Sequence, residues 1–86
     1  TFALSQNYPN PFNPSTTIRY SLLQSARVTL KVFNMLGQEV ATLANGEHPA
    51  GTFQVTFDAS HLASGVYYYQ LRAGDLNAVQ RMVYLK

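Results

Sequence analysis

The side chains that could carry acid–base chemistry are few, because the chain of 86 residues holds four carboxylates and two histidines. Glu39 and Glu47 flank a predicted hairpin, and glycoside hydrolysis requires two carboxyl groups roughly 5 to 10 Å apart. Carboxylates on exposed turns are usually solvated, which argues against that role. Asp58, Ser60 and His61 are the residue types of a nucleophilic triad, but within four consecutive positions they cannot easily form a relay around a substrate. We therefore predict that the chain is not an enzyme.

Metal binding is equally weakly indicated. His48 and His61 show no regular ligand spacing for zinc. A calcium site that uses Asp58, Asp75 and loop carbonyls stays open, because oxygen ligands from loops need no fixed spacing. A simpler role for Asp58 is an Asx-turn in which its carboxylate accepts the backbone N–H of Ser60 or His61. No cofactor and no metal ligand are predicted.

The tyrosines offer a candidate binding surface. In the run from Tyr67 to Tyr69, Tyr68 points away from its two neighbours on an alternating strand, and it could join Tyr20 or Tyr84 in a platform for a sugar or a protein partner. The alternative, which we favour, is that most of these tyrosines pack across strands.

Composition limits the function further. Hydrophobic residues make up 47% and charged residues 12% of the chain, which favours a folded domain over disorder. The net charge of +2 comes from scattered residues and does not by itself indicate nucleic-acid binding. The absence of cysteine excludes a disulfide scaffold, and no apolar run is long enough to predict a transmembrane segment. Because the start lacks Met and a signal peptide, we expect a piece of a longer protein.

The elements that must position these side chains are strands. Period-two alternation and turn signals predict strands over residues 17–22, 26–32, 39–44, 51–57, 66–73 and 78–85. Gly37 is expected to take positive φ in a turn, and Asn45-Gly46 is a strong turn pair. The last strand is apolar on both faces in places, and we expect Val83 and Leu85 to point inward.

Residues 1–16 are expected to form an extended lead-in, because Pro9, Pro11 and Pro14 exclude a helix there. The strands predict an all-β fold: an immunoglobulin-like or fibronectin-III-like antiparallel β-sandwich of about seven short strands with Greek-key connections. Tyr67, which follows a Leu and a Gly, resembles the tyrosine corner of such sandwiches, where its hydroxyl bonds to nearby backbone. We predict one domain over residues 1–86, with the lead-in packed on it.

Five segments carry a dense resemblance to a known family. They are LSQNYPNPFNPSTTI (4–18), VFNMLGQEV (32–40), FDAS (57–60), LASGVYYY (62–69) and RMVYLK (81–86). Together they resemble the type A C-terminal sorting domains of the type IX secretion system, over essentially the whole chain. Two departures are His61, where the family often has glycine, and Tyr84, where an aliphatic residue is more usual. The first puts in doubt the family's usual backbone geometry at that corner.

The resemblance implies a β-sandwich similar to the immunoglobulin-like domain of a flagellar hook-capping protein. It implies a C-terminal sorting domain of a larger secreted or surface-anchored bacterial protein. The outer-membrane secretion machinery would read it as a folded module, and its signal peptidase or sortase would act on the cargo. The implied location is the periplasm in transit, then the cell surface or the medium.

We assign two sets of candidate functional residues. Structural and family-motif roles fall to Pro9, Asn10, Pro11, Phe12, Gly37, Asp58, Leu62, Gly65 and Tyr67. Recognition is assigned to Arg81, Met82, Val83, Tyr84, Leu85 and Lys86. Recognition there requires an exposed backbone edge and apolar side chains.

Other interpretations stay open. The chain could be an accessory carbohydrate-binding or adhesive module of a secreted multidomain enzyme that uses Tyr68 and Tyr84 for stacking. It could also be a structural spacer. An exposed terminal strand could pair with a second copy, so the oligomeric state is undetermined.

Overall fold

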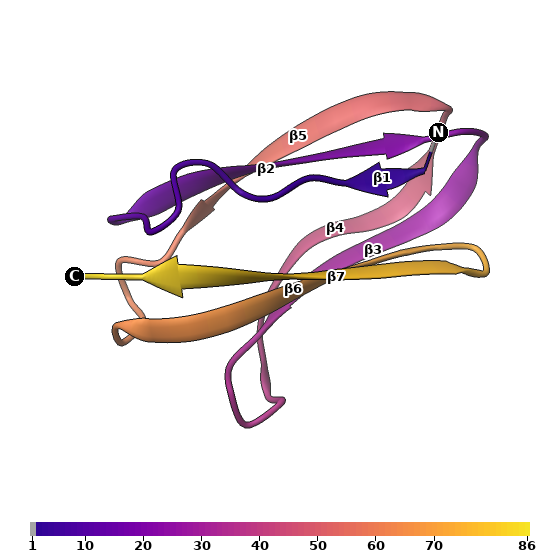
Figure 1. Cartoon of the computed structure of the whole chain (residues 1–86). Helices are drawn as coiled ribbons and strands as arrows, with labels where there is room; N and C mark the ends of the chain where they lie inside the picture. The colour runs from indigo at the N-terminus through magenta and orange to yellow at the C-terminus, as the bar shows by residue number, and fades with distance from the viewer. Residues whose placement is uncertain (1) are drawn as a thin grey trace.

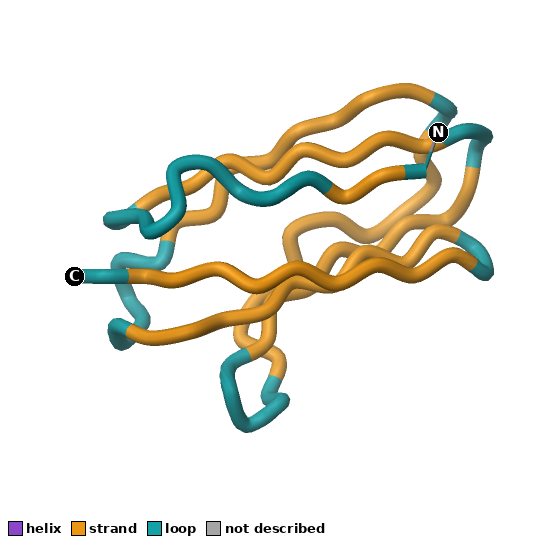
Figure 2. Tube along the Cα trace, in the orientation of Figure 1, coloured by secondary structure: helices purple, strands orange, loops and turns teal. Residues whose placement is uncertain are grey.

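The fold is a sandwich of two antiparallel sheets, seen in a computed structural model that describes residues 2–86 (Figures 1 and 2). Its strands are β1 (Ala3–Leu4), β2 (Ser15–Leu22), β3 (Ala26–Phe33), β4 (Glu39–His48), β5 (Gly51–Asp58), β6 (Gly65–Ala73) and β7 (Leu76–Tyr84). One sheet has the order β1-β2-β5 and the other β4-β3-β6-β7. The predicted all-β sandwich is confirmed. Residues 2–86 contain no helix that could cross a membrane.

Alternating side chains on each strand form the core between the sheets. On β2, for example, Ile18, Tyr20 and Leu22 point inward and are at most 5% exposed, as their spacing predicts. The buried apolar residues are Leu4, Phe12, Ile18, Tyr20, Leu22, Val28, Leu30, Val32, Phe57, Ala59, Tyr67, Tyr69, Leu71, Ala73, Met82 and Tyr84. Both sheets and the lead-in therefore share one interior.

The facing of β7 is opposite to the prediction. Met82 and Tyr84 are buried, whereas Leu85 is 52% exposed and Val83 is half-buried on the outer side. The register explains the inversion, because Met82 lies directly opposite the inward-facing Tyr67 of β6. Residues that lie opposite each other in an antiparallel pair point to the same face. The expectation that Val83 and Leu85 point inward is wrong.

The predicted turn at Asn45-Gly46 is also wrong. Both residues lie within β4, opposite Thr29 and Val28 of β3, so pairing along the whole strand overrides the local turn preference. One consequence concerns the two glutamates, which sit 47 − 39 = 8 residues apart on this single strand. At ~3.3 Å per residue they are about 26 Å apart, too far for a catalytic pair.

The turn between β3 and β4 forms a tip that projects from the body of the sandwich (Figure 2). Gly37 has the expected positive φ, at 81°. The Asn34 side-chain oxygen accepts the backbone N–H groups of Leu36 and Gln38 at 2.9 and 3.0 Å. These bonds fix the loop although Met35 is 70% exposed at its end.

The corner before β6 has both hydrogen bonds that the sequence suggests. Asp58 Oδ1 accepts the Ser60 N–H at 2.8 Å, which makes the Asx-turn. The Tyr67 hydroxyl donates to the Ala63 carbonyl at 2.7 Å, as in a tyrosine corner. Among residues 2–86 no residue other than glycine has positive φ, so His61 meets no backbone strain where the family often has glycine.

Candidate functional site

The Pro-rich lead-in connects the two sheets at one side of the sandwich. We call residues 5–14 the strap, which runs between β2 and β7 (Figure 1). On the β2 side, Tyr8 and Thr17 exchange two backbone hydrogen bonds of 3.0 Å. On the other side the strap meets β7, which is the last strand of its sheet. The strap therefore occupies the edge where a further strand would pair.

Phe12 and Asn10 of the strap satisfy the outer edge of the C-terminal strand. The Phe12 N–H donates to the Val83 carbonyl at 3.0 Å, and the Phe12 carbonyl accepts the Leu85 N–H at 3.1 Å. The Asn10 side-chain oxygen accepts the Val83 N–H at 3.0 Å. A strand edge left uncovered would present these groups to any other chain.

Two glutamines extend the same contact toward the start of the chain. Gln6 Nε2 donates to the Arg81 carbonyl at 2.7 Å, and Gln80 Nε2 donates to the Leu4 carbonyl at 3.0 Å. The outer edge from residue 81 to residue 85 is thus hydrogen-bonded to the strap. The expectation of an exposed backbone edge around Met82 and Lys86 is wrong for this stretch.

The apolar anchor of the strap is Phe12, which is 2% exposed. Its ring stacks on Tyr84 with centroids 5.3 Å apart, and it meets Phe57 edge-on at 6.3 Å. Phe12 therefore joins the strap, β5 and β7 in one aromatic cluster. Aromatic pairs in these arrangements stabilise a core beyond the area they bury.

A buried polar network fixes the turn of the strap. Asn7 and Thr16 are both 2% exposed. Asn7 Nδ2 donates to Thr16 Oγ1 at 3.0 Å and to the Pro9 carbonyl at 3.2 Å, and the Thr16 hydroxyl donates to the same carbonyl at 2.9 Å. Within residues 2–86 every buried side-chain nitrogen and oxygen has a partner. The sequence reasoning missed Asn7 and Thr16, and their place beside the Pro-rich run was the available signal.

Tyr69 of β6 binds the start of the strap through a hydrogen bond from the interior of the sandwich. Its hydroxyl donates to the Ser5 carbonyl at 2.6 Å, and burial raises the pKa of Tyr69 to about 12. Burial also raises the pKa of Tyr20, whose hydroxyl lies 3.0 Å from His48 Nε2. Both tyrosines therefore stay neutral hydrogen-bonding groups inside the fold.

The candidate recognition residues differ in burial, and Val83 is half-buried. Met82 and Tyr84 belong to the core, whereas Arg81, Leu85 and Lys86 are exposed. The Lys86 N–H donates to the Ser64 hydroxyl at 2.8 Å, which ties the segment to the loop before β6. The remaining structural candidates lie at the strap (Pro9, Asn10, Pro11, Phe12), the tip (Gly37) and the corner (Asp58, Leu62, Gly65, Tyr67).

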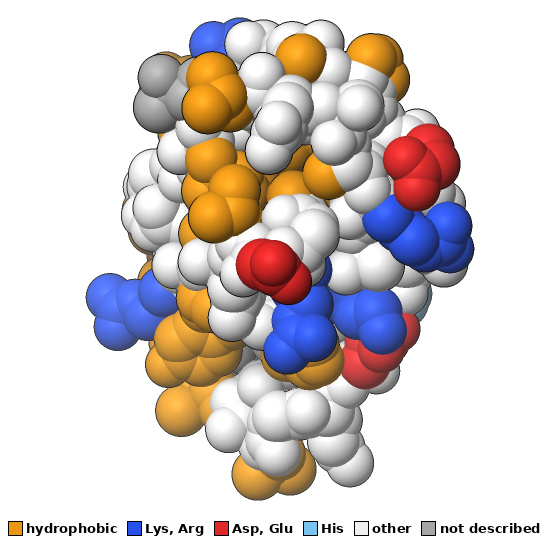
Figure 3. Space-filling model, turned by 90° about the vertical axis from the view of Figure 1, so that its right-hand side faces the viewer, with side chains coloured by type: hydrophobic (Ala, Val, Ile, Leu, Met, Phe, Trp, Pro, Cys, Tyr) orange, Lys and Arg blue, Asp and Glu red, His pale blue; other side chains and the backbone are white. Residues whose placement is uncertain are grey.

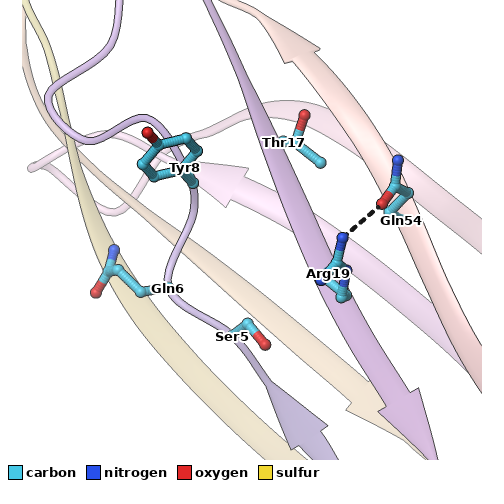
Figure 4. Close-up of a pocket in the computed structure, with 6 residues that line it drawn as sticks. All are labelled: Ser5, Gln6, Tyr8, Thr17, Arg19 and Gln54. Atoms are coloured by element: carbon cyan, nitrogen blue, oxygen red, sulfur yellow. Dashed lines mark hydrogen bonds between the residues drawn. The ribbon is translucent and has the colours of Figure 1, made fainter.

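The tyrosine platform is not formed. Tyr20 and Tyr84 are each 1% exposed, so of the three tyrosines Tyr68 alone reaches the surface, at 36%. A shallow hollow beside the strap is lined by Ser5, Gln6, Tyr8, Thr17, Arg19 and Gln54 (Figure 4). Arg19 is already bonded to Gln54 at 3.1 Å, and residues 2–86 contain no cluster of three or more His, Asp or Glu side chains. The arrangement offers surface shape and hydrogen bonds.

Residues 6–85 match the family described as the secretion system C-terminal sorting domain. The chain belongs to this family and is a C-terminal sorting signal for type IX secretion, a non-catalytic module whose cargo reaches the cell surface or is secreted.

One solved structure adds to the fold assignment. It is PorZ, described as an essential bacterial surface component of the type IX secretion system of Porphyromonas gingivalis. It superposes with a TM-score of 0.65 and 21% identity, over 99% of this chain and 11% of the PorZ chain. The chain thus spans about a tenth of PorZ, and the likeness shows the fold. No curated protein sequence matches the chain.

Proposed function

We propose that the secretion machinery reads this domain as one folded unit, residues 1–86, in which the strap and the C-terminal strand together form the address. The observation that carries the proposal is the sealed edge of β7, where strap residues hold Arg81, Val83 and Leu85 in place. A receptor then meets these residues in a single fixed arrangement. The proposed partners are the outer-membrane machinery, its signal peptidase or sortase, and the cargo in the same chain.

Burial argues for a folded address over a linear one. Met82 and Tyr84 are at most 1% exposed, so a receptor cannot contact them unless the sandwich opens. Reading the segment as an extended peptide would cost the core contacts of both side chains. The exposed side chains of residues 81, 85 and 86 remain accessible without that cost.

The test is a reporter that carries an export signal and residues 1–86 at its C-terminus. It is expressed in a type IX-competent bacterium and in a secretion-null mutant, and the surface, medium and periplasmic fractions are measured. We expect surface or medium reporter in the competent strain alone, lighter by about the 9.6 kDa of the domain if a peptidase removes it. Accumulation in the periplasm of the null mutant would support transit through that compartment.

Three variants test whether the signal is the folded domain or the linear segment 81–86. Deletion of residues 81–86 should retain the reporter in the periplasm, and so should Phe12→Asp, which leaves residues 81–86 unchanged but removes their apolar anchor. Limited proteolysis of the retained protein reports whether the domain has opened. The milder Asn10→Ala removes one edge contact and should lower export without loss of the fold. Export of Phe12→Asp at the level of the unmodified domain would favour a linear signal.

A further inference from the structure

The outer faces of the two sheets differ in chemistry. The face of β2 and β5 presents mostly hydroxyl and amide side chains: Thr17, Arg19, Ser21, Thr52, Gln54 and Thr56. The outer face of the other sheet carries four of the six basic residues, Arg27, Lys31, Arg72 and Arg81, with Glu39 and Glu47 on β4. Its formal charge is therefore 4 − 2 = +2, equal to that of the whole chain.

Apolar side chains lie on the same face, over β6 and β7. Tyr68 lies directly opposite Arg81, and Val66 opposite Val83. Val79 is 54% and Tyr68 36% exposed, although Met82 and Tyr84 on the inner face of β7 and Tyr67 and Tyr69 on that of β6 are buried. Figure 3 shows most of the Lys and Arg side chains on the lower half of the molecule, the side of this sheet, with hydrophobic side chains between and below them.

Two of the four basic side chains on this face interact with neighbouring side chains, and the other two have no carboxylate nearby among the described residues. Lys31 Nζ lies 3.2 Å from Glu39 Oε1, and Arg27 donates to the Asn45 side chain at 3.2 Å. Within residues 2–86 no carboxylate lies within 4 Å of the Arg72 or Arg81 guanidinium. An arginine free of local partners beside an exposed tyrosine is the composition enriched at protein interface hot spots.

We propose that this basic–apolar face, defined by Val66, Tyr68, Arg72, Val79, Arg81 and Val83, docks on a protein of the secretion machinery that presents an apolar patch with an acidic rim. The inference rests on the proposed function, in which the secretion machinery recognises the folded domain, and it specifies which surface makes the contact. Charge complementarity requires that the partner surface be negatively charged. The apolar side chains at the centre of the face supply the contact from which water is excluded. An anionic membrane fits less well, because the face defined above carries two basic residues, Arg72 and Arg81, below the four to eight clustered basic residues typical of lipid recognition.

The test compares charge and aromatic variants on this face with a matched variant on the other sheet. In the reporter fusion, Arg81→Glu and Tyr68→Ser should each lower surface reporter by about thirtyfold, the scale expected for a hot spot. Arg81→Lys keeps the charge and should retain more export than Arg81→Glu. Arg19→Glu, the same substitution on β2, should export normally. Thermal unfolding of each purified domain checks that the exposed substitutions leave the fold intact.

A photo-crosslinking amino acid at position 79, with position 54 as the control, tests the partner. We expect a crosslink from position 79 to a machinery protein, at a site beside Asp or Glu side chains, and its loss in Arg81→Glu. A crosslink to lipid alone, or a dimer of the purified domain that Arg81→Glu dissociates, would overturn the proposal. If deletion of residues 81–86 blocks export while Arg81→Glu and Tyr68→Ser do not, the docking face is wrong and the folded address stands. If the deletion itself exports normally, the proposed function fails.

Discussion

The rings of Phe12 and Tyr84 stack with their centroids 5.3 Å apart and 25° between their planes. One residue belongs to the Pro-rich strap and the other to the end of the C-terminal strand. Their backbones form a parallel bridge, so this one contact joins the first and the last of the segments that resemble the family. The strap and the C-terminal strand are therefore a single structural unit.

Phe12→Ala is expected to lower the free energy of unfolding by about 3 to 5 kcal/mol, because it removes a ring that is 2% exposed and leaves a cavity. Urea denaturation of the purified domain measures the change. Tyr8→Ala in the same strap is the control, since Tyr8 is 81% exposed and its loss should cost within about 0.5 kcal/mol. Equal effects of the two substitutions would contradict the placement of Phe12 in the core.

Asn10→Ala removes the side-chain acceptor of the Val83 N–H and should cost about 1 kcal/mol. The Val83 amide should then exchange its hydrogen roughly fivefold faster, which hydrogen–deuterium exchange with residue resolution measures. Asn13→Ala, an exposed asparagine of the same strap, is the control and should leave this amide unchanged. Unchanged protection of Val83 in Asn10→Ala would show that the edge is not sealed by this side chain.

Tyr67→Phe keeps the buried ring and deletes the hydroxyl that donates to the Ala63 carbonyl at 2.7 Å. We expect a loss of about 1 kcal/mol in the free energy of unfolding, measured by thermal or chemical denaturation. Tyr68→Phe, one residue further along and on the outer face, should be neutral. A neutral Tyr67→Phe would mean that the corner is held by packing alone.

Stability should fall at alkaline pH, in part through Tyr69. Its pKa is raised from about 10 to about 12 in the folded state, so the unfolded chain releases this proton first. The contribution is complete below pH 10 and is lost as pH rises through 12. Denaturation between pH 8 and pH 12 should show a shallower fall for Tyr69→Phe than for Tyr68→Phe. Parallel curves for the two variants would contradict the assignment to Tyr69.

The local alternation of polar and apolar residues was sufficient to predict the inward-facing side chains of a strand that has one polar and one apolar face. The inward set Ile18, Tyr20 and Leu22 follows from strict alternation with polar neighbours. β7 has apolar residues on both faces, and its facing is set by the register that places Met82 opposite Tyr67. No local signal encodes that register, which is why the predicted inward pair was wrong.

The sealed edge could not be predicted for a related reason. The hydrogen bonds of Phe12 to Val83 and Leu85 join the two ends of the chain, and a single sequence carries no signal for such a pairing. The prolines indicated an extended segment and Phe12 an apolar anchor, but the surface that receives them appears only when both sheets are assembled. The family resemblance singled out residues 9–12 and 81–86 without indicating that the two segments pair.

The hydrogen bonds between Phe12 and the segment from Val83 to Leu85 also constrain when the strap can close during synthesis, because ribosomes build chains from the N-terminus. Within this domain the strap is made well before its hydrogen-bonding partners, because Val83 and Leu85 follow Phe12 by about 70 residues. A polypeptide whose translation stops before residue 83 has nothing to close the strap against. The closed strap therefore forms only after residues 83–85 have been made, and an export system that required it would leave behind molecules interrupted before them.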